Sequence, residues 1–403
     1  METLLTGLRI SSEIVTVLWG ALVFIRVLDQ TGKTEDLNSW LQRFHPNKDM
    51  QVFLLSRGWV TVLEGVSGFG SPPALVAPIL IRMGVSQELA MLLPLYGNVL
   101  AVPFGAMSTP LIIGFPSFKF GFLGQQVSLL SAALNFTTFI GIWVLIRGWK
   151  LPESKSEWFW LMRGFMGATM GMIFGGMFAL QWSAAVSGMF ALLFWIPWTR
   201  LNDVFDRKIL FLVEMTSFLM LGQIGFRGMA IAGFRISNPG FWVAVGSIWL
   251  ALRSGKKIDF FRKILSESFF KLKKPFIVTT TMTLFILYLT SWMQMNVAYF
   301  SIGSIQSLWL GFIAPGLAGT STLGNLWVSS AFLTQAQISQ AAWVAIGSGF
   351  GTLISFQILT AVATTVGLKK IPLTVWKKSF ALGAGSLAVI TLGLIVSELL
   401  KFS

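Results

Sequence analysis

The residues best suited to chemistry lie in one short stretch, Glu64 to Pro73, which reads Glu-Gly-Val-Ser-Gly-Phe-Gly-Ser-Pro-Pro inside apolar sequence. Three glycines and two prolines in ten residues cannot continue a helix, because glycine costs backbone entropy and proline lacks an N–H donor. Within a lipid bilayer, a broken backbone persists only where protein or a water-filled cavity satisfies the freed amides. An ionisable side chain at that depth indicates a functional site. The stretch therefore predicts a solute site with Glu64 as its titratable group; the plainer alternative is a kink that leaves Glu64 near the headgroups.

A second stretch, Gly316 to Asn325, is also small, polar and helix-breaking between apolar flanks. Thr320, Ser321, Thr322 and Asn325 offer hydroxyl and amide partners to a solute. The competing interpretation is a packing seam, since small residues also line ordinary helix interfaces in membranes. The pairing of this break with the first one favours the site.

Composition places both stretches in a membrane protein. The chain has 403 residues, of which 11% are charged and 54% hydrophobic, and its mean hydropathy is +0.73. Spans of ~20 residues allow about ten crossings, in one integral domain over residues 1–403. The absence of cysteine and the single histidine predict no metal site, no cofactor and no enzymatic chemistry.

The fold class that we expect is an all-α polytopic membrane protein with two broken-helix hairpins. The hairpins cover residues 51–82 and 304–333. The spans are expected near residues 10–28, 86–113, 121–147, 158–180, 183–199, 209–226, 237–252, 275–300, 338–368 and 379–400.

The basic residues test this topology. If each hairpin enters and leaves on one side, the connections 29–50, 148–157, 200–208, 253–274 and 369–378 share a face and hold the lysine and arginine clusters. Basic loops are normally cytoplasmic, so the net charge of +14 reflects topology rather than nucleic-acid binding. The hairpins then enter from opposite sides, as in inverted-repeat transporters. We expect repeat 1 at about 10–147, linking helices at about 158–252 and repeat 2 at about 275–400.

Two blocks of sequence resemble the lactate permease family of bacterial proton symporters for L-lactate and glycolate. Residues 63–72 are similar to that family's Glu-Gly-Ala-Ala-Gly-Phe-Gly-x-Pro signature, and Asn98 to Pro110 to its Asn-x-x-x-x-x-Phe-Gly-Ala-Met/Ile-x-x-Pro stretch. Residues 317–325 and 351–367 are similar to two later segments. The chain departs from the family where Ser321 replaces an aspartate and Thr352 a lysine, which leaves the family's coupling open. The resemblance also implies a divergent, N-terminally shorter member.

The resemblance implies uptake of a small monocarboxylate such as lactate, coupled to protons, across the bacterial cytoplasmic membrane. A carboxylate would sit at the exposed amides where the second helix of each hairpin begins, since a helix N-terminus favours an anion. Glu64 would exchange the proton. The expected substrate-binding residues are Gly68, Phe69, Gly70, Ser71, Asn98, Thr320, Ser321 and Asn325.

Arg57 lies seven residues before Glu64, on roughly the same helix face, and is a candidate anion partner. The alternative is that it extends to the cytoplasmic headgroups. The expected partners are a small organic anion, protons and the lipid bilayer, with a homo-oligomer or a chain that supplies N-terminal helices left open. Two other functions also stay open: an uncoupled or sodium-coupled transporter of another organic anion, and a non-transporting receptor or assembly component on a permease fold.

Overall fold

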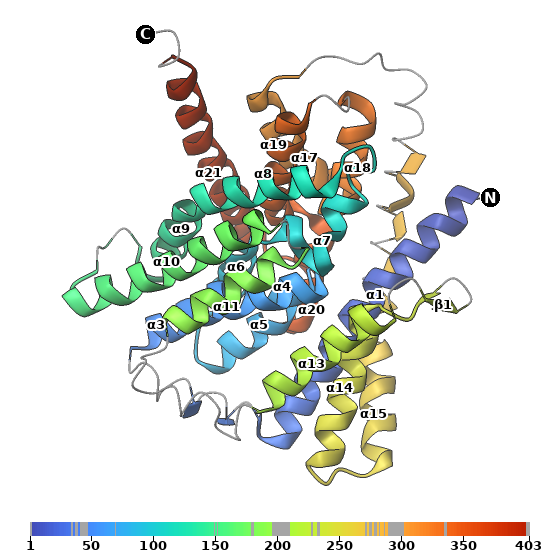
Figure 1. Ribbon diagram of the computed structural model, residues 1–403. Helices are drawn as coiled ribbons and strands as arrows, with labels where there is room; N and C mark the ends of the chain where they lie inside the picture. The colour runs from blue at the N-terminus through green and yellow to red at the C-terminus, as the bar shows by residue number, and fades with distance from the viewer. Residues whose placement is uncertain are drawn as a thin grey trace.

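A computed structural model gives the fold and is almost entirely helical (Figure 1). Among the described residues, the only strands are the two-residue β1 (Ala230–Ile231) and β2 (Phe234–Arg235), which pair antiparallel. The structure describes residues 2–33, 35–36, 39–40, 47–68, 70–148, 150, 152–178, 181–195, 210–226, 229–231, 234–270, 272–273, 276–277, 280–281, 283–285, 287–288, 302–333 and 337–399.

The first predicted hairpin is built from four helical segments. Its first limb joins α3 (Lys48–Phe53), the π-helical η1 (Leu54–Trp59) and α4 (Val60–Ser67), and its second limb is α5 (Ser71–Arg82). The chain turns at Gly68 (φ 59°, ψ −159°) and at Gly70 (φ 75°, ψ 6°), backbone conformations that only glycine adopts readily. Prolines then follow at the start of α5, where their missing N–H costs nothing. The break predicted between Glu64 and Pro73 is thus present.

The second hairpin consists of α17 (Ser304–Ala318) and α18 (Ser321–Phe332), which pack against each other. Gly319 ends α17 in a left-handed conformation (φ 81°). Thr320 caps α18 by accepting a hydrogen bond from the Leu323 N–H through its hydroxyl, the usual role of threonine at this position. This break also lies where the sequence predicts one.

Three expected spans are themselves broken. The span 121–147 divides into α8 (Phe120–Ala133) and α9 (Asn135–Arg147), with a bend of 45°. Of the other two, the first combines α6 (Gln87–Asn98), the 3₁₀ turn η2 (Val102–Phe104) and α7 (Gly105–Ile112), with a bend of 70°. The second combines α19 (Ile338–Gly351), the 3₁₀ turn η4 (Thr352–Ile354) and α20 (Phe356–Thr365), with a bend of 48°. The sequence analysis expected each as a continuous span.

The remaining helices surround the two hairpins and the two helices bent at 3₁₀ turns, and all except α15 correspond closely to other expected spans. They are α1 (Glu2–Thr31), α8 (Phe120–Ala133), α9 (Asn135–Arg147), α10 (Lys155–Met177), α11 (Ser183–Trp195), α13 (Leu210–Gly225), α14 (Pro239–Arg253), α15 (Ile258–Phe270) and α21 (Leu373–Leu399).

One expected loop is a helix, and one expected span lies largely outside the described residues. The stretch 253–274, expected as a loop, contains the helix α15, whose Phe261 and Ile264 are buried. Most of the expected span 275–300 falls outside the described residues. By length and composition, Leu373–Leu399 alone could cross a membrane, and up to four helical units could if each bent pair counts as one span, within the described part of the chain. Ten crossings therefore stay a prediction.

The two hairpins and the two bent helices form corresponding units. The bounds of α5 and α18, and those of η2 and η4, differ by the same 250 residues. The units pack crosswise, because α5 contacts α20 while α18 contacts α7. Figure 1 shows α4, α6, α7 and α20 near the centre of the molecule. This crossing brings both hairpin tips to one region.

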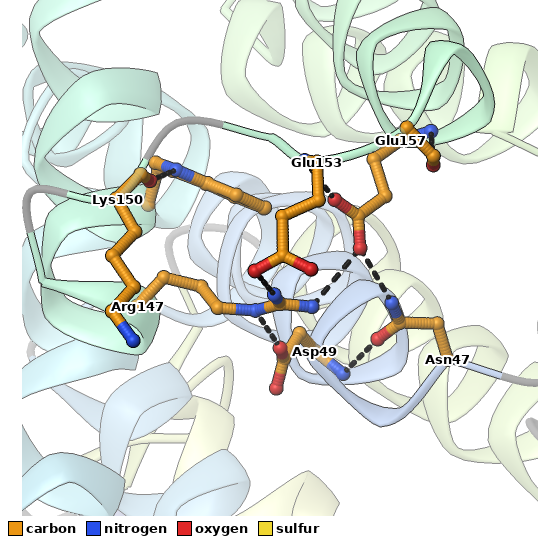
Figure 2. Close-up of polar contacts among 8 residues, drawn as sticks. Asn47, Asp49, Arg147, Lys150, Glu153 and Glu157 are labelled. Carbon is orange, nitrogen blue, oxygen red and sulfur yellow. Dashed lines mark hydrogen bonds and ion pairs between the residues drawn. The ribbon is translucent and has the colours of Figure 1, made fainter.

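Ion pairs join helices at one end of the molecule. Arg147 at the end of α9 contacts Asp49 in α3 and Glu157 in α10, the latter at 3.0 Å, and Asn47 also donates to Glu157 at 2.9 Å (Figure 2). Other pairs that link separate helices are Arg82–Asp29, Lys378–Glu88, Arg253–Glu214 and Arg26–Glu267. Each pair connects positions on the side that the basic loops predict to be cytoplasmic.

Candidate functional site

Both hairpin tips border one small cavity, with about 30 Å³ of space for the centre of a water-sized sphere. The first hairpin contributes its tip and α5, the second its tip and the start of α18, and both bent helices contribute residues at their bends. The described lining residues are Glu64, Gly70, Pro73, Leu95, Asn98, Val102, Gly105, Ala106, Pro110, Thr320, Ser321, Thr322, Thr352 and Ile358.

Glu64 forms the acidic side of the cavity. Its side chain is only 2% exposed, and its Oε2 accepts a hydrogen bond from Asn98 Nδ2 at 2.6 Å. This bond connects the first hairpin to α6 just before the bend. The Asn98 Oδ1 atom is buried and has no hydrogen-bond partner among the described residues. Asn98 therefore has a free acceptor for a substrate hydroxyl.

The opposite side of the cavity is neutral and carries hydroxyl groups. Ser321, the first residue of α18, shares a hydrogen bond of 2.7 Å with Ser348 in α19. Thr352, which lies one turn after Ser348, lines the cavity and donates to the Gly349 carbonyl. Thr320 and Thr322 complete this side.

The charge distribution separates the two sides. Among the described residues that line the cavity, Glu64 is the only one with an ionisable side chain. The positive end of the α18 dipole points at the hydroxyl side, and the N–H groups of a first helical turn have no acceptor within their own helix. An anion is thus favoured at the start of α18, away from Glu64.

The start of α5 has fewer free N–H donors for an anion than the sequence analysis expected. The Gly68 N–H donates to the Glu64 carbonyl and the Ser71 N–H to the Gly68 carbonyl, while the Ser71 hydroxyl also donates to Gly68. Pro72 and Pro73 have no N–H. The expectation that Gly68 and Ser71 present free amides is therefore wrong, because the glycine turn itself uses these donors.

Only some of the predicted site residues line the cavity. Glu64, Gly70, Asn98, Thr320 and Ser321 line the cavity. Gly68 and Ser71 form the turn beside it, and Phe69 lies outside the described residues.

Asn325 is buried one turn into α18, outside the cavity lining, and donates to the Pro110 carbonyl at 3.2 Å. Its position joins α18 to α7, which is a packing role between the two units.

Arg57 does not line the cavity. Its guanidinium is 1% exposed and donates to Thr61 Oγ1 at 2.5 Å and to Asn135 Oδ1 at 2.7 Å, with the Phe139 ring 5.9 Å from its Cζ. The alternative prediction, that Arg57 extends to the headgroups, is therefore wrong, because its guanidinium is buried between helices. Any effect on an anion acts through its charge at a distance.

The sequence analysis missed three contributors to the site. Gly105 and Ala106 line the cavity, and Ser348 bonds Ser321 from behind it. Gly105 and Ala106 belong to the Phe-Gly-Ala-Met block, which could have indicated them. Ser348 had no such signal, because small residues recur along α19 and nothing in the sequence distinguishes this one.

Comparisons with known proteins agree with this geometry. A model of the L-lactate permease family matches residues 1–205. The chain is 36% identical over 105 residues to a putative L-lactate permease of Haemophilus influenzae, which covers 26% of this chain and 20% of that protein. It is 28% identical to the L-lactate permease of Escherichia coli K12 over 145 residues, and 26% identical to the glycolate permease of the same strain over 150 residues.

These matches cover a limited part of each relative. They span 25% of both Escherichia coli permeases, and 34% and 35% of this chain. The residues matched by the family model contain the first hairpin, α6 and α7, which supply Glu64, Asn98 and Gly105 to the cavity. Because the family model matches half of its residues, this chain belongs to the L-lactate permease family.

Proposed function

We propose that the protein is a secondary transporter of a small 2-hydroxy monocarboxylate, such as lactate or glycolate, in the bacterial cytoplasmic membrane. One observation carries this proposal: both hairpin tips and both bent helices border a single cavity, which holds one carboxyl group opposite a set of hydroxyls. The names of the relatives, L-lactate permease and glycolate permease, support the same substrate class. These relatives are all permeases by name, which agrees with transport rather than enzymatic chemistry.

The architecture of the proposal is an inverted repeat. The shared spacing of 250 residues between α5 and α18 and between η2 and η4 supports it. So does the contact between Lys48 and the Gly84 carbonyl at 3.3 Å, which brings the two ends of the first hairpin together. On the opposite side, the Ser329 hydroxyl in the second hairpin donates to the Gly114 carbonyl at 2.6 Å. Substrate would then bind near the midplane between the two tips.

The substrate has one preferred orientation in this cavity. Its carboxylate lies against Ser321 and the first-turn amides of α18, since the helix dipole favours an anion there. Its 2-hydroxyl lies towards Asn98, whose Oδ1 has no other partner among the described residues. This orientation keeps the carboxylate away from the like charge of Glu64.

Coupling to protons is assigned to Glu64. A deprotonated Glu64 would repel an anionic substrate across a small, poorly solvated cavity. Protonation of Glu64 before anion binding removes this repulsion, and the two species then cross together. No other described residue of the cavity lining can carry the proton.

The test is transport of labelled L-lactate by the purified protein in proteoliposomes. We expect accumulation driven by an inward proton gradient, and counterflow when unlabelled lactate is inside. Glu64→Gln should abolish gradient-driven accumulation and retain counterflow, because glutamine still accepts a hydrogen bond from Asn98 but cannot release a proton. The matched control is Gln87→Glu, an exposed position remote from the cavity lining.

The alternatives are outcomes of the same experiment. Accumulation driven by sodium and indifferent to protons would overturn the coupling assignment. Equal gradient-driven uptake by Glu64→Gln and the wild type would overturn the role of Glu64. If the wild type moves none of a panel of small acids in counterflow, the transport proposal fails and a receptor or assembly function takes its place.

A further inference from the structure

At one equivalent position beside the cavity, the two corresponding units carry different residues: Gly105 in the first unit and Ser355 in the second. Both residues directly follow a 3₁₀ turn, and both donate their N–H to the first carbonyl of that turn, Val102 or Thr352. Their backbones are nearly alike, with φ −61° and ψ 146° at Gly105 and φ −65° and ψ 112° at Ser355. The two positions are therefore structural equivalents, again 250 residues apart.

In the second unit, the Ser355 hydroxyl joins two elements. Its Oγ accepts a hydrogen bond from the Ile358 N–H at 3.2 Å, which caps the start of α20. The same Oγ donates to the Gly319 carbonyl at 2.6 Å, at the tip of the second hairpin. A serine hydroxyl can do both at once. The bent helix and the hairpin tip of this unit are thus fixed to each other by one side chain.

In the first unit, Gly105 has no side chain, and the carboxylate of Glu64 takes up that space. A Cβ built on Gly105 would overlap Glu64 Oε1 and would lie 3.3 Å from the Cα of Gly68 at the hairpin tip. Gly68 ends the first limb of its hairpin as Gly319 does in the second unit. The same corner of the fold therefore holds a carboxylate in one unit and a serine hydroxyl in the other.

We propose that Gly105 is a positioning residue: its missing side chain admits the Glu64 carboxylate to the junction of hairpin tip and bent helix, in the place that the Ser355 hydroxyl has in the other unit. The first junction therefore depends on an ionisable carboxyl group, and the second on a hydroxyl group that stays neutral. A change of charge or bonding at Glu64 then acts directly on the contact between α4 and α7. This inference adds a second residue to the coupling group and rests on the proposed function of Glu64.

The start of α7 is consistent with this difference. Ala106, Met107 and Ser108 have left-handed backbones, with φ of 44°, 56° and 65°, whereas α20 begins in the ordinary right-handed way after its serine cap. The helix without a side-chain cap is the one whose first turn is irregular.

The test is a double-mutant cycle with Gly105→Ser, Glu64→Ala and the combination of both. Gly105→Ser alone should lower the Tm in detergent, because the new side chain overlaps the carboxylate. Glu64→Ala alone should also lower it, because the junction loses the group that fills it. In the combined variant the serine replaces the carboxylate as Ser355 does, so its Tm should exceed that of both single variants. Its lactate counterflow should return, while proton-driven accumulation stays absent.

The control is Gly121→Ser in α8, where a Cβ meets nothing within 4 Å and both Tm and uptake should match the wild type. If Gly105→Ser does not fold, recovery of a folded protein in the combined variant is itself the expected result. Strictly additive losses of Tm, or a wild-type Tm for Gly105→Ser, would overturn the inference. The Tm cycle decides this even if the wild type transports no monocarboxylate, in which case only the proposed function is lost.

Discussion

Two buried ionisable residues on one limb of the first hairpin have different surroundings. Glu64 lines the cavity and has Asn98 as its partner. Arg57 is held on the far side by Thr61 and Asn135, no described carboxylate forms an ion pair with it, and its Nε lacks a hydrogen-bond partner among the described residues. An unneutralised cation buried at this depth is costly. We predict that its positive potential extends to the cavity and favours a bound anion there.

Replacement of this charge should therefore weaken substrate binding without any lost contact to the substrate. Seven helical residues separate Arg57 from Glu64 along the chain by ~10 Å, and a unit charge at that distance contributes about 1.5 kcal/mol at an effective dielectric constant of 20. The proposed carboxylate position at the start of α18 lies beyond Glu64, so Arg57→Met should raise the KM for lactate in counterflow by less than about tenfold, and Arg57→Lys, which keeps the charge, much less. A KM for Arg57→Met equal to that of the wild type would contradict the electrostatic role. Thermal unfolding of both variants checks that they fold.

At the scale of elements, the fold depends on helices that break inside apolar segments, and α7 is the least regular of them. Three consecutive residues other than glycine are left-handed at its start, a conformation that costs about 1–2 kcal/mol per residue. The surrounding contacts must outweigh this cost. They include the Ser108 hydroxyl, which donates to the Gln181 carbonyl at 2.7 Å, and the Asn325 bond to Pro110.

Met107 is half-buried and outside the cavity lining. Because its backbone is left-handed, we expect a glycine variant at this position to be more stable than a valine variant, the reverse of the order in an ordinary helix. In an ordinary helix valine is more favourable than glycine by about 0.3–0.5 kcal/mol. With φ at 56°, a β-branched side chain is the worst choice and glycine the best. Met107→Gly should thus be more stable than Met107→Val by about 1 kcal/mol or more, as measured by unfolding in detergent. The matched pair Met170→Gly and Met170→Val, in the regular helix α10, should show the ordinary order; the same order at Met107 would rule out the left-handed turn.

At the scale of the whole molecule, contacts between helices separate by side. Ion pairs such as Arg82–Asp29 and Lys378–Glu88 join residues at the end that the basic loops predict to be cytoplasmic. The Ser329 and Ser108 hydroxyls make their contacts to Gly114 and Gln181 at the other end. Both groups of contacts fit hairpins that enter from opposite sides.

The absence of cysteine from the chain makes this topology directly measurable. Single cysteines at Gln87, after the first hairpin, and at Gln306, at the start of the second, are both exposed. In cells treated with a membrane-impermeant maleimide, Gln306→Cys should react and Gln87→Cys should react only after the membrane is opened. Ser117→Cys and Ser254→Cys serve as references for the outer and the cytoplasmic side. Reaction of both test positions from the same side would exclude oppositely oriented hairpins.

The sequence by itself determined the helical membrane class, most helix positions and both hairpin breaks. The breaks were predictable because each depends on local backbone chemistry: glycines at Gly68, Gly70 and Gly319 adopt positive φ, and a break inside apolar sequence is tolerated only where protein or a water-filled cavity satisfies the freed backbone groups. Glu64 was predictable for a similar reason, since a carboxyl group among apolar residues has few structural explanations. None of these inferences requires knowledge of which segments meet.

The tertiary structure decided everything that depends on partners far apart in the sequence. Only the structure shows that Arg57 donates a hydrogen bond to Asn135, that Asn325 donates one to the Pro110 carbonyl, and that Ser321 and Ser348 share one. Three expected spans are also bent, although none of them has a cluster of turn residues as dense as that of the first hairpin. The physical reason is that a hydrogen bond or a close approach at Gly105 is a property of two segments, and only the packing of both units determines which groups face the cavity.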